Sequence, residues 1–120
     1  MAAAPGPVAV LGAGSVGCWV GGCLAAAGVE VHFVGRPRVL DALRRHGLTL
    51  TDLEGGRREI GPERLHLHET PPAGAALWLL TVKSGATAEA VRGLAPGSRL
   101  LSLQNGIGNP QRAAAAAPGI

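Results

Sequence analysis

The sequence predicts an α/β protein whose open, mainly parallel sheet is Rossmann-like and carries helices on both faces. Three observations predict this fold class. Short apolar runs alternate with helical patterns over most of the chain, as in successive β-α units. The first apolar run ends in a glycine-rich turn at 12–17, and a helical pattern follows at once. The apolar run at 76–82 is continuous, which is typical of a strand buried on both faces of a parallel sheet.

Composition limits the classes of protein that fit. The 120 residues support one domain with a core of its own, and 47% apolar against 16% charged residues exclude a disordered chain. The net charge of +3 is modest, and no basic stripe is interleaved with aromatic residues, so we expect no nucleic-acid partner. Cys18 and Cys23 lie on different faces of a predicted helix. We interpret them as small core fillers, which fits a reduced, cytoplasmic protein.

The first charged side chain is Glu30, so a signal peptide or a membrane span is an alternative for the N-terminal part. A signal peptide requires a positively charged residue before its apolar segment, and no Lys or Arg precedes this one. Seven glycines between Gly6 and Gly28, together with two prolines, would weaken a helix that crosses a bilayer. A strand, turn and helix explain these glycines better, so we expect no membrane partner.

The first half of the chain reads as a β-α-β-α run. After a flexible lead at 1–6, we expect a strand at 7–11, a helix at 15–27, a strand at 29–34 and a helix at 38–46. Gly17 and Gly21 would let the first helix approach the sheet closely, and Gly28 would end it. The apolar stripe expected to face the core from this helix is Val16, Val20, Cys23, Leu24 and Ala27.

The second half begins with alternating residues around Gly55-Gly56, which predict a β-hairpin at 48–60. Strands are expected at 65–68, 76–82 and 99–103, and a helix at 87–94. His66 and His68 would share one strand face. A metal pair there is conceivable, but we favour solvated histidines and expect no metal. Asn109 resembles an N-cap followed by Pro110 at the first helical position.

The glycine turn has the spacing of a dinucleotide-binding loop. Gly12 would allow the tight turn, Gly14 would let a pyrophosphate approach the backbone, and Gly17 would let the helix pack near the strand. The N-terminus of the new helix would face the phosphates with its free N–H groups and positive dipole end. The expected pyrophosphate-binding residues are Gly12, Ala13, Gly14, Ser15, Val16 and Gly17.

Further candidate residues follow other predicted strands, where ligands of open parallel sheets bind. NAD-binding proteins place an acidic residue after the second strand, but this chain has Arg36 there. A guanidinium can hold a 2′-phosphate through paired hydrogen bonds, so we expect NADP (NADPH) rather than NAD. Arg38 is a possible helper. The alternative for Arg36 is a solvated surface arginine.

Lys83 and Asn105 follow two later strands. Lys83 is the only lysine beside ten arginines, and its compact ammonium could contact cofactor or substrate oxygens. Asn105 offers both a donor and an acceptor. The simpler alternatives are a charge at a strand end for Lys83 and an ordinary Asn-Gly turn for Asn105.

Several of these motifs together resemble the ketopantoate reductases (2-dehydropantoate 2-reductases). The similar stretches are the Val-Leu-Gly-Ala-Gly-Ser-Val-Gly turn at 10–17, Val-Gly-Arg at 34–36, Thr-Val-Lys at 81–83 and Leu-Gln-Asn-Gly-Ile-Gly-Asn at 103–109. The glycine turn is shared with many dehydrogenases. The two later motifs at this spacing are more specific, and the resemblance covers nearly all of 7–112.

The resemblance implies NADPH-dependent reduction of a 2-oxo acid to a 2-hydroxy acid in pantothenate and coenzyme A synthesis. By motif matching, 12–17 would hold the pyrophosphate, Arg36 the 2′-phosphate, and Lys83 would line the cofactor cleft. Asn105 would touch nicotinamide and substrate. Many family members carry a bulkier residue where Gly85 stands, which leaves the identity of the 2-oxo acid open.

Family members also have a second, helical domain that supplies the catalytic lysine and a substrate-holding carboxylate. We therefore expect 7–109 to be the dinucleotide-binding domain and 110–120 a helix leading toward such a domain, through which a homodimer could form. The chain alone should bind NADPH weakly and turn over little. Two alternatives remain: a non-catalytic NADP-binding or redox-sensing module, and a related 2-hydroxy acid dehydrogenase with another substrate.

Overall fold

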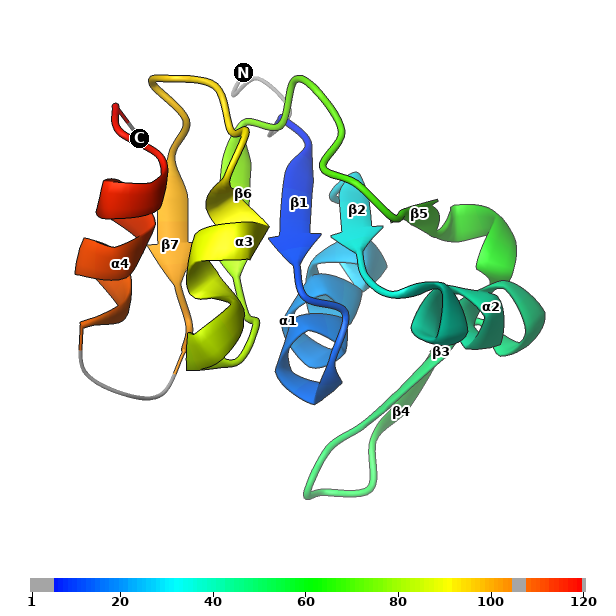
Figure 1. Ribbon diagram of the computed structural model, residues 1–120. Helices are drawn as coiled ribbons and strands as arrows, with labels where there is room; N and C mark the ends of the chain where they lie inside the picture. Colours follow the sequence, from blue (N-terminus) through cyan, green and yellow to red (C-terminus); the bar gives the residue numbers. More distant parts are fainter. Residues whose placement is uncertain (1–5, 105–107, 120) are drawn as a thin grey trace, which may run out of the picture.

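Five parallel strands form the central sheet, in the order β5-β2-β1-β6-β7 (Figure 1). The computed structural model describes residues 6–104 and 108–119. The strands of this sheet are β1 (Val8–Leu11), β2 (Val31–Val34), β5 (His66–His68), β6 (Leu77–Leu80) and β7 (Leu100–Ser102). All four pairings are parallel. From β1 the chain adds β2 and then β5 toward one edge, and it then returns to the other side of β1 to add β6 and β7. The predicted Rossmann-like sheet is therefore confirmed.

Helices cover both faces of the sheet, as the sequence predicts. They are α1 (Ser15–Ala26), α2 (Pro37–His46), α3 (Thr87–Val91) and α4 (Asn109–Ala116). Side chains of α1 and α2 join one core cluster, and side chains of α3 and α4 join the other. In Figure 1, α3 and α4 lie in front of the sheet and α1 lies behind it. Two short 3-10 helices, η1 (Pro62–Arg64) and η2 (Ser84–Ala86), complete the helical segments among the described residues.

The predicted hairpin forms a separate antiparallel pair, β3 (Leu48–Thr51) and β4 (Arg57–Ile60). It packs on α1, because a Cβ on Gly22 would lie 2.7 Å from Leu48 Cδ2 and 2.8 Å from Leu50 Cδ2. Leu50 and Ile60 are buried in the same core cluster as α1. The hairpin therefore extends that side of the core.

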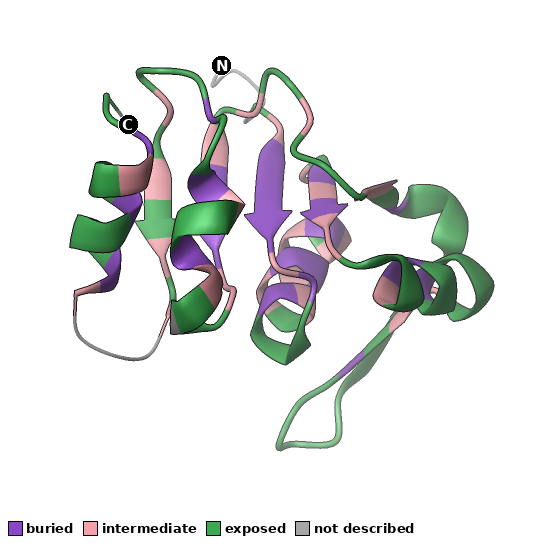
Figure 2. Cartoon of the chain, viewed as in Figure 1, coloured by how far each residue is buried: buried purple, intermediate pink, exposed green. Residues whose placement is uncertain are grey.

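Strand β1 supplies both core clusters, since its side chains alternate between the two faces. Val8 and Val10 belong to the α1 side, whereas Ala9 and Leu11 belong to the side of α3 and α4. All four residues are buried, and Figure 2 shows β1 as a buried strand along its length. This central position explains why the first apolar run does not alternate with polar residues.

The two faces are not covered evenly. On the side of α3 and α4, the outer strands β2 and β5 carry His32, His66 and His68 beside a single aliphatic residue, Val34. On the side of α1, the edge strand β7 carries Leu101, which is 49% exposed, and Leu103, which follows this strand, is 37% exposed. Each layer of helices thus covers only part of the sheet.

The apolar stripe predicted for α1 is wrong at both of its ends. Val16 is 50% exposed and Ala27 is exposed, while the middle members pack only partly buried against the core. The residues of α1 that are buried are the small ones: Gly17, Gly21, Gly22 and Ala25. The helix lies so close to the sheet that a bulky stripe has no room, so the predicted role of Gly17 and Gly21 is confirmed.

Several predicted boundaries also shift. The second strand begins at Val31 rather than at 29, because Val29 N donates to Leu24 O at 3.0 Å and closes the end of α1. Asn109 is not an N-cap: Gly108, with φ 84°, occupies that position, and no side chain caps α4. Asn109 is instead 1% exposed and accepts a hydrogen bond from Arg112 Nη1 at 3.1 Å.

None of the helices in the described part of the chain is both long and apolar enough to cross a bilayer.

Gly21→Ala tests the close approach of α1. Its Cβ would lie 2.6 Å from Phe33 Cε1 and 3.0 Å from Val10 Cγ2, and both side chains are fully buried. We expect the free energy of unfolding to fall by roughly 1–2 kcal/mol, because the cost of overpacking exceeds the gain in helix propensity. Urea denaturation measures this change. Gly22→Ala is the matched control, since the methyl ends of Leu48 and Leu50 can move aside; equal losses in both variants would contradict the prediction.

Candidate functional site

The glycine turn leaves the end of β1 and is held first by β2. Gly12 has φ +113°, a conformation that glycine adopts readily and other residues rarely do. The backbone N–H groups of Gly12 and Ala13 both donate to Val34 O, at 3.0 and 3.1 Å. The turn therefore begins with its first two N–H groups bound to the neighbouring strand.

Residues that follow β6 hold the same turn from the other side. Thr81 N donates to Leu11 O at 3.0 Å, and the Thr81 hydroxyl lies 2.7 Å from Gly12 O and 3.0 Å from Leu11 O. A Cβ on Gly12 would lie 2.8 Å from Val82 Cγ1 and 2.9 Å from the Val82 nitrogen. Any side chain at position 12 would thus collide with the backbone after β6.

The other two glycines of the turn have opposite surroundings. A Cβ on Gly17 would meet Gly12 O, Thr81 Oγ1 at 2.8 Å and Val10 Cγ1 at 2.9 Å, whereas a Cβ on Gly14 would meet nothing within 4 Å. Gly17 is therefore required for packing. Gly14 is exposed and leaves open space beside the backbone.

The N-terminus of α1 is suited to an anion. No side chain caps it, and its first turn contains no acidic residue. The first N–H groups of a helix have no acceptor within the helix and carry the positive end of its dipole. Together with the open space at Gly14, this arrangement fits the pyrophosphate of a dinucleotide.

Arg36 lies at the same edge of the sheet. Gly35 packs on the glycine turn, since its Cβ would lie 2.9 Å from Ala13 Cβ. Arg36 follows it as the N-cap of α2, and its side chain is exposed. The structure thus places an exposed guanidinium one residue after a glycine that touches the turn.

Lys83 also lies at this edge, because it follows β6 one residue after Val82, which contacts Gly12. Its side chain is exposed, and its carbonyl oxygen accepts a hydrogen bond from Ala86 N at 2.9 Å. Asn105, the fourth expected site residue, lies outside the described residues. The structure therefore brings 12–17, Arg36 and Lys83 to one edge of the sheet.

Sequence reasoning missed a polar network beside Lys83. Gln104 Nε2 donates to Val82 O at 2.9 Å and to Thr87 Oγ1 at 2.8 Å. The Thr87 hydroxyl, which is fully buried, lies 3.4 Å from Asn109 Oδ1. The network links the ends of β6 and β7 to the starts of α3 and α4. The position of Gln104 directly after a predicted strand was the only signal for it.

Both cysteines are free and half-buried. Cys18 Sγ donates to Ala13 O at 3.5 Å, and burial raises the pKa of its thiol above the ordinary value. A thiol with a raised pKa is a poor nucleophile at neutral pH. Cys18 therefore supports the turn as a packing residue.

Comparison with known proteins gives the family. The family model described as "Ketopantoate reductase PanE/ApbA" matches residues 8–119. The chain belongs to the ketopantoate reductase family.

Individual relatives agree with this assignment. The chain is 35% identical to the 2-dehydropantoate 2-reductase of Pyrococcus horikoshii over 106 residues, which are 86% of this chain and 34% of the relative. A ketopantoate reductase structure from Ralstonia eutropha matches with a TM-score of 0.79 and 36% identity, over 91% of this chain and 37% of that one. The chain thus spans about a third of the length of the ketopantoate reductases it matches.

The fold is shared more widely than the family. A D-mandelate dehydrogenase, described in a ternary complex with NADH and anilino(oxo)acetate, matches with a TM-score of 0.78 over 93% of this chain and 37% of that one. Its identity is 23%, so this likeness concerns the fold alone.

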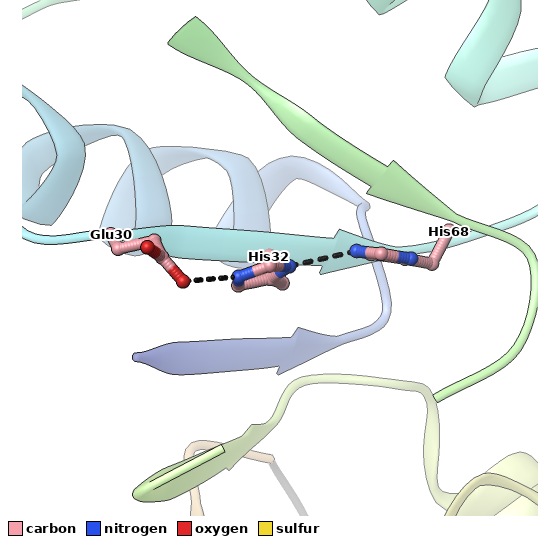
Figure 3. A network of polar contacts seen from close by, with 3 residues as sticks. All are labelled: Glu30, His32 and His68. Atoms are coloured by element: carbon pink, nitrogen blue, oxygen red, sulfur yellow. Dashed lines mark hydrogen bonds and ion pairs between the residues drawn. The ribbon is translucent and has the colours of Figure 1, made fainter. Parts of the chain in front are cut away.

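A second cluster of polar side chains lies on strands β2 and β5 (Figure 3). Its His68 is at the carboxyl end of β5, where Gly35 N donates to His68 O at 3.0 Å. His32 Nε2 is 2.7 Å from Glu30 Oε2, and His32 Nδ1 is 2.8 Å from His68 Nε2. The ring of His66 stacks on that of His32 with centroids 4.6 Å apart. His66 is exposed, in line with the expectation of solvated histidines. The sequence did not indicate that pairing of β2 with β5 brings three rings together.

Hydrogen bonds link the members of the cluster. A carboxylate only accepts, so His32 Nε2 is the donor to Glu30, and the other ring nitrogen of His32, Nδ1, shares one hydrogen with His68 Nε2. The hydrogen bond from His32 lowers the pKa of Glu30, and burial together with the neighbouring His32 and His66 lowers the pKa of His68. Among the described residues, no group of three His, Cys, Asp or Glu side chains could hold a metal ion.

These shifts predict that stability falls in mild acid. The pKa of His68 lies below its ordinary 6.5 in the folded chain, so the unfolded chain binds more protons and stability decreases as the pH falls through 6.5. The lowered pKa of Glu30 adds a loss below its ordinary 4.5. Urea midpoints at pH 7.5, 6.0 and 5.0 measure the effect. His68→Asn should reduce the loss between pH 7.5 and 5.0, whereas His46→Asn, at an exposed position on α2, should not; equal pH dependence in both variants would refute this.

Proposed function

We propose that the chain binds NADPH at the edge of the sheet and forms the cofactor-binding part of an NADPH-dependent 2-oxo acid reductase that converts 2-dehydropantoate to pantoate. The observation that carries the proposal is the steric contrast within the turn. Gly12 and Gly17 have no room for a side chain, while Gly14 faces open space. Membership of the ketopantoate reductase family supports the reaction class.

Each proposed ligand contact follows from a group at this edge. The N–H groups of 14–17 would bind the pyrophosphate, since the N–H groups of Gly12 and Ala13 already bind Val34. Arg36 would hold the 2′-phosphate and so favour NADPH over NADH. Lys83 would line the cleft, and Asn105 would orient nicotinamide and substrate; for Asn105 the proposal rests on the sequence motif.

The bound cofactor would supply a hydride to the carbonyl carbon of the 2-oxo acid. Negative charge then develops on the carbonyl oxygen and requires a proton donor or a cation nearby. The exposed ammonium of Lys83 is a cation at the proposed edge. We propose the complete reaction for a protein of the relatives' length, in which 7–109 form the dinucleotide-binding domain and 110–120 lead toward a helical domain that mediates a homodimer.

Arg36→Ala tests the choice of cofactor. A charge-assisted contact with the 2′-phosphate contributes about 1.5–3 kcal/mol, so NADPH affinity should fall about tenfold or more while NADH affinity stays within about threefold. Fluorescence titration with both nucleotides measures this. Arg45→Ala, at an exposed position in the last turn of the same helix, is the matched control. An Arg36→Ala variant that keeps the wild-type preference would rule out the assignment.

Gly14→Ala separates binding from folding. Its Cβ meets nothing within 4 Å and its backbone is extended, so the urea midpoint should stay at the wild-type value. The new methyl group would occupy the space proposed for the pyrophosphate, and NADPH affinity should fall about tenfold or more, or roughly 1.4 kcal/mol. Unchanged affinity in this variant would show that the phosphates do not approach the backbone at Gly14.

A further inference from the structure

Thr81 lies directly against the glycine turn, and its hydroxyl contacts two backbone oxygens. Because both neighbours are carbonyl oxygens, the hydroxyl is the donor, with Gly12 O at 2.7 Å and Leu11 O at 3.0 Å as acceptors. Its oxygen would also lie 2.8 Å from a Cβ on Gly17. One side chain from the end of β6 thus touches the beginning of the turn and the beginning of α1.

We propose that Thr81 is a positioning residue for the pyrophosphate-binding turn, fixing the orientation of the Gly12–Ala13 peptide so that the N–H groups at the start of α1 face the phosphates. The proposal rests on the proposed function, in that the turn must bind a dinucleotide. Thr81 itself need not touch the cofactor.

Two hydrogen bonds hold the Gly12–Ala13 peptide from opposite sides, and together they are called the clamp. The carbonyl oxygen of this peptide, on Gly12, accepts from the Thr81 hydroxyl, and its N–H, on Ala13, donates to Val34 O at 3.1 Å. In a trans peptide these two groups point in opposite directions within one plane. Bonds to β6 on one side and to β2 on the other therefore set the orientation of the plane.

The clamp is needed because Gly12 would otherwise leave the backbone of the turn free to adopt other conformations. Gly12 adopts φ +113°, and glycine has more accessible backbone conformations than any other residue. Without the hydroxyl, the peptide can rotate away from the orientation that aims the following N–H groups outward. Fixing it before binding lowers the entropy cost of ordering the loop around the ligand.

The experiment compares Thr81→Val with Thr81→Ser in the 120-residue chain. Valine keeps the shape and removes the donor, so NADPH affinity should fall about tenfold. Serine keeps the donor, so affinity should stay within about threefold of the wild type. Thr49→Val, the same substitution at an exposed position of β3, is the matched control and should leave affinity unchanged.

A second ligand distinguishes positioning from general loss of structure. The nucleotide 2′-AMP carries the adenosine and the 2′-phosphate but no pyrophosphate, so Thr81→Val should change its affinity by less than about threefold. Equal losses for NADPH and 2′-AMP would contradict the proposal. So would wild-type NADPH affinity in Thr81→Val.

Two further results, an unfolded Thr81→Val variant and a wild type that does not bind NADPH, also test the proposal. If Thr81→Val does not fold, Thr81→Ala and Thr81→Ser replace the comparison, because they differ only by the hydroxyl; equal NADPH affinity in these two would overturn the clamp. A folded wild-type chain that binds no NADPH would overturn the proposed function and the clamp with it. Tight binding by the wild type with no effect of the hydroxyl would overturn the clamp alone.

Discussion

The close contact between α1 and the sheet determines the rest of this structure. Gly17 and Gly21 place the helix backbone where side chains would otherwise lie, against Val10, Phe33 and Thr81. The turn before the helix must then be tight, which requires the positive φ of Gly12. The same contact brings the N-terminus of α1 to the carboxyl edge of the parallel strands, where ligands of such sheets bind.

Three strand ends converge at that edge. The β1 end supplies the turn, the β2 end supplies Val34 O and Arg36, and the β6 end supplies Thr81 and Lys83. Parallel pairing of β1 with both neighbours makes this convergence unavoidable. Positive charge, free N–H groups and open space at Gly14 together suit an anionic dinucleotide, and the family of the chain is one of reductases.

Most of the fold could be predicted from the sequence because local patterns determine it. The apolar runs, the glycine turn and the Gly55-Gly56 hairpin each specify one element from a few adjacent residues. The apolar stripe of α1 could not be predicted in the same way. Helical periodicity favours bulky residues at the contact, whereas here the contact consists of glycine and alanine.

Contacts between distant segments explain the other differences. The histidine cluster requires β2 to pair with β5, whose histidines are 36 residues apart in sequence. The buried role of Asn109 depends on Thr87, 22 residues earlier, and an Asn-Pro pair alone favours a cap. Arg36 and Lys83 could be placed from sequence because each lies within three residues of the end of a strand. The role of the Thr81 hydroxyl could not, since its acceptors, Leu11 O and Gly12 O, are about 70 residues earlier in the chain.

The most direct test of this account is to follow the backbone amides of the ¹⁵N-labelled chain by NMR during titration with NADPH. We expect the largest shifts at the amides of 14–17, smaller shifts near Arg36 and Lys83, and little change at the hairpin β3-β4. Saturable shifts confined to other surfaces, or no shifts from a folded chain at millimolar NADPH, would contradict the claim that the glycine turn binds a dinucleotide.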